Sequence, residues 1–172
     1  GTPHALPQDW QLIDGYLVGP GANLTSANLT GKDLTGANLT GANLDHAILT
    51  NTNLTSANLT GASLFGVHSG GITGTPSILP AHWQLTNGYL IGSGAQLVDA
   101  VLSHQDLTDA DLSHVVGIRI HLENATLTNT DLRGANLTDA FLTGVTGAAK
   151  YNLATILPHG FDPHAAGWTL VS

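Results

Sequence analysis

The sequence predicts an all-β fold in which the chain winds into a solenoid of stacked coils. Two observations lead to this prediction: leucine recurs at every fifth position over two long blocks, and the residues between the leucines are mostly Ala, Asn, Thr and Gly. A period of five matches neither the ~3.6 residues of a helical turn nor the alternation of a half-buried strand. A coil explains it, because each pentapeptide can form one side of the coil.

The two blocks of leucines define the expected core. In the first block leucine occupies every fifth position from Leu24 to Leu64, and in the second, from Leu97 to Leu142, the phase continues through a single gap at Gly117. Four pentapeptides would make a coil of about twenty residues, and successive coils would stack at strand spacing, about 4.8 Å. We expect each leucine to point inward, together with the residue, usually Ala, two positions earlier.

The remaining positions of the pentapeptide are typical of corners and surfaces. Asn or Asp usually precedes the leucine, Thr or Ser usually follows it, and Gly, Ser, Asp, His or Asn comes next. Gly permits the positive φ that corners often require. Asn and Thr side chains can bond the backbone of a turn or stack in ladders along the axis.

The motif Ala-(Asn/Asp)-Leu-x-Gly stands complete at Ala37-Asn38-Leu39-Thr40-Gly41 and, without its glycine, at Ala135-Asn136-Leu137. It resembles the motif of the pentapeptide-repeat family. The resemblance covers nearly two thirds of the chain. It implies a right-handed quadrilateral β-helix.

A longer repeat overlies the pentapeptides. The stretch from Leu6 to Gly19 returns 73 residues later, from Leu79 to Gly92, and a third copy begins at Ile156. We therefore expect one module at about 1–74, a second at about 75–153 and a partial third at 154–172.

The leucines of the longer repeat keep the five-residue spacing. Leu12 and Leu17, and likewise Leu85 and Leu90, are five residues apart. We therefore expect the junctions to contribute sides to the coil. The prediction is a single domain over residues 1–172, built as one continuous solenoid with loop insertions.

The composition argues against two classes of partner. The chain has 4 Lys and Arg against 12 Asp and Glu, which gives a formal charge of −8 and no basic patch, so we expect no direct nucleic-acid binding. No apolar run approaches the ~18 residues of a membrane span, so we expect no membrane insertion. The chain contains neither Cys nor Met, which removes thiolate metal sites and the residues most easily oxidised.

The densest set of possible metal ligands is His159, Asp162 and His164, within a seven-residue insertion of the third module. A loop of this length can bring such side chains together. No HExxH or paired-Cys motif accompanies them, so the interpretation we favour is no metal and no cofactor. These three residues are the metal candidates if that interpretation is wrong.

Catalytic chemistry is not predicted. Ser103-His104 and Ser113-His114 place a hydroxyl beside an imidazole in the sequence, but side chains at the corners of a solenoid diverge and form no cleft. We expect no catalytic residues and no enzyme activity.

Three tryptophans, Trp10, Trp83 and Trp168, occupy equivalent places in the longer repeat. An exposed aromatic platform could stack on sugars. We favour packing over the hydrophobic edge of a coil, because large aromatic side chains are more often buried than displayed.

The function we expect is that of a structural or interaction protein at the surface of a bacterium or outside it. The segments GYLVGPGANL and FDPHAAGWTLV resemble stretches of exported bacterial pentapeptide-repeat proteins. The partner would be a protein, either a surface partner or a second copy, with the edge at Trp168 to Leu170 meeting the edge at Thr2 to Leu12 of another chain.

The alternative function comes from family members that mimic DNA. An acidic rod of this kind would act in the cytoplasm and bind a topoisomerase such as gyrase. The net charge favours this alternative, but the first block, Gly21 to Gly66, carries only Asp33 and Asp45 against Lys32. A DNA mimic needs acidic columns along its whole length.

Overall fold

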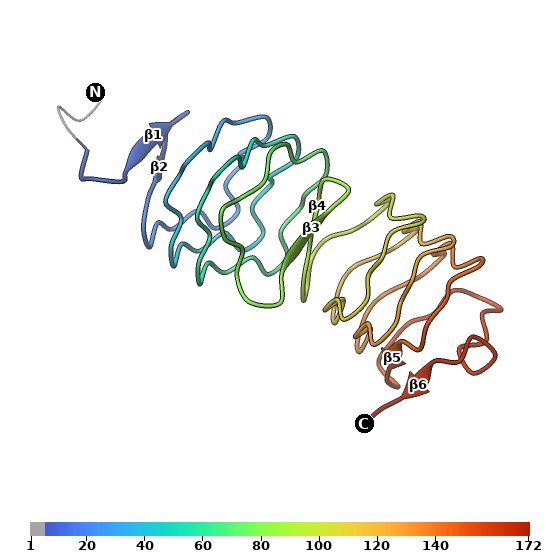
Figure 1. The fold of residues 1–172 in the computed structure, drawn as a ribbon. Coiled ribbons are helices and arrows are strands. Elements are labelled where there is room, and N and C mark those ends of the chain that lie inside the picture. The colour runs from blue at the N-terminus through green and yellow to red at the C-terminus, as the bar shows by residue number, and fades with distance from the viewer. Residues whose placement is uncertain (1–5) are drawn as a thin grey trace.

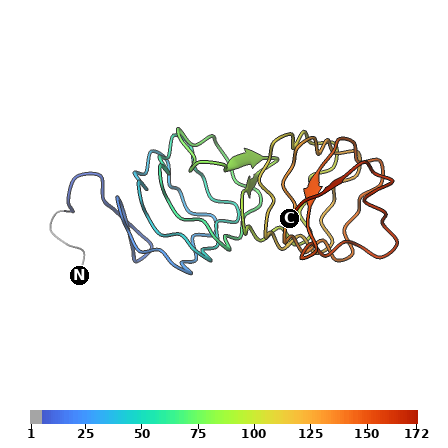
Figure 2. The same ribbon diagram turned by 90° about the horizontal axis from the view of Figure 1, so that it is seen from below.

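The computed structural model describes residues 6–172, in which the pentapeptides form two stacks of coils (Figures 1 and 2). Parallel bridges pair residues twenty positions apart, such as Asn23 with Asn43 and Val101 with His121. Each coil therefore contains four pentapeptides, and each pentapeptide bridges through the residue before its leucine. The described residues form no helix that is long and apolar enough to cross a membrane.

Backbone hydrogen bonds between coils hold the stack together. The Leu24 N–H donates to the carbonyl oxygen of Asn43 (2.7 Å), and the Asn43 N–H donates back to the carbonyl oxygen of Ala22 (2.9 Å). The inward direction of the leucines is confirmed, because all nine in the first block are at most 2% exposed. The alanine two positions earlier is also buried, as at Ala22 and Ala37.

The corners use the residue types that the sequence suggested. The second residue after each leucine of the two blocks adopts a positive φ, whether it is glycine, as at Gly41 (65°), or another residue, as at Ser26 (57°). The Asn before the leucine bonds the turn that follows: Asn23 Oδ1 accepts hydrogen bonds from the backbone N–H and the hydroxyl of Thr25, at 3.2 and 2.7 Å. This local turn, repeated at many corners, explains the Asn and Thr of the motif.

Two buried threonines replace the inward alanine without leaving an unpaired hydroxyl. Thr52 donates its hydroxyl hydrogen to the carbonyl oxygen of Leu29 (2.8 Å), and Thr130 does the same to Leu107 (2.7 Å). Because each hydroxyl finds an acceptor in the preceding coil, a polar residue is tolerated in the core.

The longer repeat forms hairpins rather than sides of the coil. Strand β1 (Gln11–Ile13) pairs antiparallel with β2 (Tyr16–Val18), and β3 (Gln84–Thr86) pairs in the same way with β4 (Tyr89–Ile91). Both residues of each turn, Asp14-Gly15 and Asn87-Gly88, have positive φ, as tight hairpins prefer. The expectation drawn from the leucine spacing is therefore wrong here: Leu12 faces Leu17 across a hairpin, and Leu85 faces Leu90.

The second hairpin lies between the two stacks (Figure 1). On one wall the bridges continue past it, from His68 to Gln96 and on to Val116. On another wall the hairpin turn intervenes: the Ile72 N–H donates to the Gly88 carbonyl oxygen (3.0 Å), and Asn87 Nδ2 donates to the Val101 carbonyl oxygen (2.8 Å). The stacking expected from the sequence is thus kept along one wall, while the hairpin separates the coils elsewhere.

The C-terminal segment covers the far end of the second stack. Strand β5 (Lys150–Tyr151) pairs parallel with β6 (Thr169–Leu170). Trp168 is buried, with its ring 4.8 Å from that of Phe161 and 6.4 Å from that of Tyr151. The start of the third module therefore closes part of the core.

Truncation of one inward leucine should destabilise the whole stack. Leu34→Ala should lower the free energy of unfolding by about 2–5 kcal/mol, because Leu34 is fully buried and its loss leaves a cavity. Thr30→Ala, on the exposed side of the same coil, should change it by less than about 0.5 kcal/mol. Urea unfolding followed by circular dichroism would measure both, and equal effects would contradict the inward assignment.

A corner should reject a β-branched residue even where there is room for it. Gly41 has a φ of 65°, and a Cβ added there would meet nothing within 4 Å. Gly41→Val should cost about 1–3 kcal/mol from backbone strain alone, whereas Gly41→Asn, which tolerates this conformation, should cost less than half as much. Equal melting temperatures for the two variants would argue against strain at the corner.

Candidate interaction surfaces

The three metal candidates lie in the loop between β5 and β6. His159, Asp162 and His164 are all exposed. Asp162 Oδ1 accepts hydrogen bonds from the backbone N–H groups of His164 (2.9 Å) and Ala165 (3.1 Å). Asp162 therefore orders its own loop. Across residues 6–172 no three His, Cys, Asp or Glu side chains are grouped in a way that could hold a metal ion.

The serines beside histidines do not bond to them. Ser103 donates to Glu123 Oε2 (2.6 Å), and Ser113 donates to Asp111 Oδ1 (2.6 Å). Glu123 also contacts His121, whose Nδ1 lies 3.1 Å from Oε1. This order places the carboxylate between the hydroxyl and the imidazole. A nucleophile relay needs the imidazole in the middle, so the arrangement does not activate Ser103.

Within residues 6–172, three of the four Lys and Arg side chains form ion pairs, whereas most of the carboxylates do not. Three ion pairs join Lys32 to Asp14 (2.5 Å), Arg119 to Asp99 (2.6 Å) and Arg133 to Asp131 (2.5 Å). Hydrogen bonds from Arg133 hold the pKa of Asp131 below its ordinary value. Hydrogen bonds from Arg119 do the same for the pKa of Asp99. These two carboxylates thus stabilise the wall itself.

Charges alternate in sign along one column of the second stack. Asp99, Arg119 and Asp139 follow one another at intervals of twenty residues, one coil apart. Both carboxylates raise the pKa of the Arg119 guanidinium, Asp99 through hydrogen bonds and Asp139 through charge. This column is therefore not a continuous acidic stripe.

A polar hollow of about 320 Å³ lies beside the second stack. It combines carboxylates with the possible cations His82 and Lys150; its lining is His82, Asp109, Ala110, Asp111, Asn129, Asp131 and Lys150. Asp131 is paired with Arg133, but Asp109 and Asp111 form no ion pair among the described residues, so two carboxylates of the hollow have no cationic partner.

The tryptophans of the hairpins pack. Trp83 lies against Gly92 and contacts the cores of both stacks, and Trp10 lies against Gly19 in the same way at the N-terminal end. A Cβ at either glycine would meet the indole ring at less than 3 Å. The glycines are therefore required by the packed rings, as the packing interpretation of these residues predicts.

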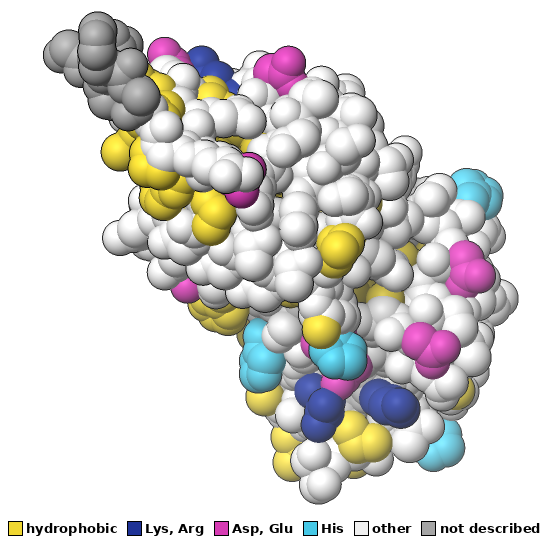
Figure 3. Space-filling model, turned by 60° about the vertical axis from the view of Figure 1, so that its left-hand side comes forward, with side chains coloured by type: hydrophobic (Ala, Val, Ile, Leu, Met, Phe, Trp, Pro, Cys, Tyr) yellow, Lys and Arg dark blue, Asp and Glu magenta, His cyan; other side chains and the backbone are white. Residues whose placement is uncertain are grey.

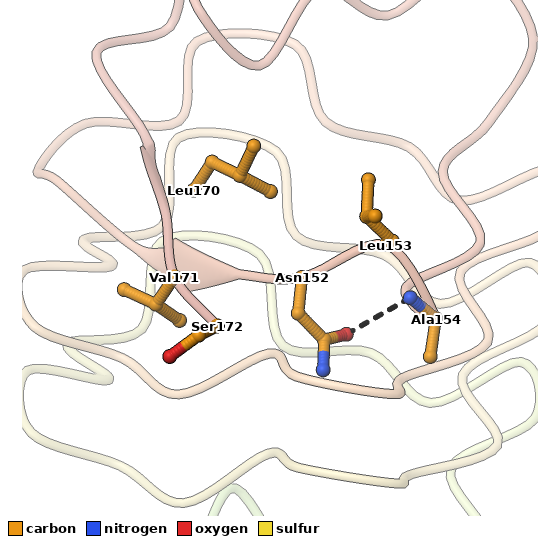
Figure 4. Close-up of a pocket in the computed structure, with 6 residues that line it drawn as sticks. All are labelled: Asn152, Leu153, Ala154, Leu170, Val171 and Ser172. Carbon is orange, nitrogen blue, oxygen red and sulfur yellow. Dashed lines mark hydrogen bonds between the residues drawn. The ribbon is translucent and has the colours of Figure 1, made fainter.

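Exposed leucines mark the two ends of the molecule. At the N-terminal end, where Figure 3 shows hydrophobic side chains gathered, Leu12 and Leu17 form the outer side of the β1–β2 hairpin; we call this pair the N-terminal face. At the other end a hollow of about 550 Å³ contains the exposed Leu153 and Leu170 (Figure 4). We call it the C-terminal hollow; its lining is Asn152, Leu153, Ala154, Leu170, Val171 and Ser172.

The two contact edges expected from the sequence coincide only in part with these surfaces. Of the edge at Thr2 to Leu12, residues 2–5 lie outside the described residues, and Leu12 belongs to the N-terminal face. Of the edge at Trp168 to Leu170, Trp168 is buried and Leu170 lines the hollow. Leu17 and Leu153 were not predicted; the Asp14-Gly15 turn signal could have revealed Leu17.

A family comparison agrees with the period of the coil. The model of the family described as pentapeptide repeats matches in eight copies, over residues 21–55, 33–68 and 118–146. The chain thus contains pentapeptide repeats of this family in both stacks. No curated protein matches its sequence.

Several solved pentapeptide-repeat structures resemble this one. The Nostoc PCC 7120 protein alr5209 is 23% identical, with 84% of each chain covered and a TM-score of 0.35. HetL, from the same cyanobacterium and involved in heterocyst differentiation regulation, is 27% identical over 73% of this chain and 55% of its own, with a TM-score of 0.31. QnrB1, a plasmid-mediated fluoroquinolone resistance protein, is 16% identical over 88% and 81%, with a TM-score of 0.42.

Acid should weaken the wall through Asp131. Its pKa is lowered in the folded state, so its contribution to stability is present above the ordinary Asp pKa of about 4 and is lost as the pH falls through the lower folded value. Asp131→Asn keeps the acceptor Oδ1 but removes the charge. We expect it to lower the free energy of unfolding at pH 7 by up to about 1 kcal/mol, and by less at pH 3.

Urea titrations at the two pH values measure this difference. Asp109→Asn is the matched control, since Asp109 forms no ion pair within residues 6–172. A loss for Asp131→Asn that is the same at both pH values would contradict the charge argument.

Proposed function

We propose that this pentapeptide-repeat protein is a non-enzymatic interaction protein, exported to the surface of a bacterium or beyond it, and that its contacts are made through its ends. The observation that carries the proposal is that the strongly exposed leucines among residues 6–172 lie at the two ends, although the walls also expose other apolar side chains such as Phe65 and Val101. Polar wall side chains such as Asn23 and Asp131 bond their own turns and neighbours, whereas Leu17 and Leu153 at the ends are exposed. Exposed apolar groups of this kind are typical of contact surfaces.

The arrangement of the side chains on the walls supports the absence of catalysis in this proposal. Side chains at successive corners point away from one another, and the cluster of hydroxyl, carboxylate and imidazole at Ser103, Glu123 and His121 has the wrong order for a nucleophile. Family resemblance adds that the coil is right-handed and four-sided. A coil of four pentapeptides is compatible with that shape.

The charge distribution does not favour the DNA-mimic alternative. The acidic side chains Asp99 and Asp131 are paired with arginines, and Asp99 and Asp139 flank Arg119 along the axis. A surface that imitates the phosphates of DNA needs unpaired negative charge in regular columns. We therefore retain the interaction protein as the proposed function.

Export rests on the sequence. The closing segment FDPHAAGWTLV is similar to those of exported bacterial relatives, and the absence of Cys and Met suits an oxidising exterior. The expected location is the cell surface or the medium of the bacterium that encodes the protein.

Cell fractionation tests this location. Antibody raised against the 172-residue chain should detect it in the medium or on intact cells, and protease added to intact cells should remove the surface signal. A cytoplasmic enzyme blotted in parallel is the control for lysis. Recovery of the protein only in the cytoplasm, protected from protease until the cells are broken, would refute export.

A further inference from the structure

The two hairpins are internal copies that differ in their surroundings. They lie 73 residues apart, and each pairs one leucine with another across its strands, Leu12 with Leu17 and Leu85 with Leu90. The β3–β4 hairpin has a stack of coils on both sides, whereas the described residues place a stack on only one side of β1–β2 (Figure 1). The second hairpin therefore shows what the first one can bind.

Each hairpin has two apolar sides. Toward the stack that follows, Val18 and Ile91 are both buried. On the opposite side the two hairpins differ. Leu90 of β3–β4 is 0% exposed within the core of the preceding stack, whereas its counterpart in β1–β2, Leu17, is 47% exposed. The same side chain, in the same register, is thus buried wherever the end of a coil stack covers it.

The contact at β3–β4 also shows how closely a coil end approaches. The Leu90 N–H donates to Ser69 Oγ (2.9 Å), in addition to the bond between Ile72 and Gly88. A Cβ on Gly88 would lie 3.1 Å from the Gly71 nitrogen, so the backbones nearly touch. This is a built interface between a hairpin face and a coil end.

We infer that the N-terminal face of one copy docks against the C-terminal hollow of a second copy, so that copies join head to tail. The inference rests on the proposed function, in which the ends make the contacts. It assigns to Leu12 and Leu17 the role that Leu85 and Leu90 have inside the chain. The internal junction joins a hairpin to a coil end, which favours this arrangement over two hairpins meeting face to face.

The C-terminal hollow has the properties of a receiving surface. Leu153 is 94% exposed and Leu170 is 54% exposed. Figure 4 shows Leu170 on the side of Val171 and Leu153 on the side of Ala154, with Asn152 between them. Strand β6 pairs with β5 and, among the described residues, with no other strand, so its outer edge can accept backbone hydrogen bonds.

The geometry of the molecule suits a linear assembly. The β1–β2 hairpin and strand β6 lie at opposite ends of the stacked coils (Figure 1). A contact between unlike surfaces at opposite ends does not close on itself unless the copies also rotate into a ring, so it extends as a chain.

Light scattering on size-exclusion fractions of the 172-residue chain tests the inference. The average mass should rise with protein concentration. Leu17→Asp and Leu153→Asp should each weaken self-association by at least ~10-fold in Kd, because each would bury an unpaired charge in the contact. Both leucines are exposed, so neither change opens a cavity, and unchanged circular dichroism and melting temperature would confirm folding. Thr30→Asp, on an exposed wall, should associate as the original chain does.

A mixture of the two variants decides the direction of docking. The Leu17→Asp chain keeps an intact hollow and the Leu153→Asp chain keeps an intact N-terminal face, so an equimolar mixture should form a dimer and nothing larger. Failure of the mixture to form this dimer would overturn the inference. So would unimpaired self-association of Leu153→Asp, which would indicate that two N-terminal faces meet. A concentration-independent monomer would overturn it as well, while leaving the export proposal to its own test.

Discussion

The structure depends on one constraint: each coil makes most of its backbone hydrogen bonds to the coils above and below it, and only its turns bond within the coil, as Ala27 does to Leu24. For example, the Asn43 carbonyl oxygen accepts a hydrogen bond from the Leu24 N–H of the preceding coil, and the Asn43 N–H donates to the Ala22 carbonyl oxygen of that same coil. The Leu44 N–H donates to the Ser63 carbonyl oxygen of the next coil. A coil is therefore stable only between partners, and any element that ends or interrupts the stack must supply comparable partners. The hairpins and the C-terminal segment supply such partners where the stack is interrupted or ends.

The β3–β4 hairpin shows how an interruption is absorbed. His68 bridges to Gln96, 28 residues on instead of the usual twenty. The extra residues leave the coil as a hairpin whose turn is bonded to Ile72 on one side and Val101 on the other. One wall keeps its register, and the hairpin replaces the missing contacts elsewhere. An insertion of this kind is tolerated because it adds its own hydrogen-bonding edge and two apolar faces.

The period of five predicted the core because the direction of a side chain in the coil is set locally, by the position within the pentapeptide. The same period misled at Leu12 and Leu17, whose spacing matches the coil but whose intervening Asp14-Gly15 turn makes a hairpin. Turn chemistry outweighed periodicity there. The packing of Trp168 was expected, but its partner Phe161 could not be predicted, since that contact depends on where a loop returns in space. The exposure of Leu153 could not be predicted for the same reason.

The division between walls and ends explains why interaction, rather than chemistry, is the expected use of this fold. On the walls the repeat places like side chains one coil apart, at about strand spacing, so charged residues must alternate in sign or bond locally to coexist. Asp99 and Arg119 do the first, and Asp33, which accepts bonds from the backbone and hydroxyl of Thr35, does the second. Groups used in this way are not free to act on a substrate. Within residues 6–172, the first hairpin and the C-terminal segment each pack against one stack only, and it is there that leucines are exposed.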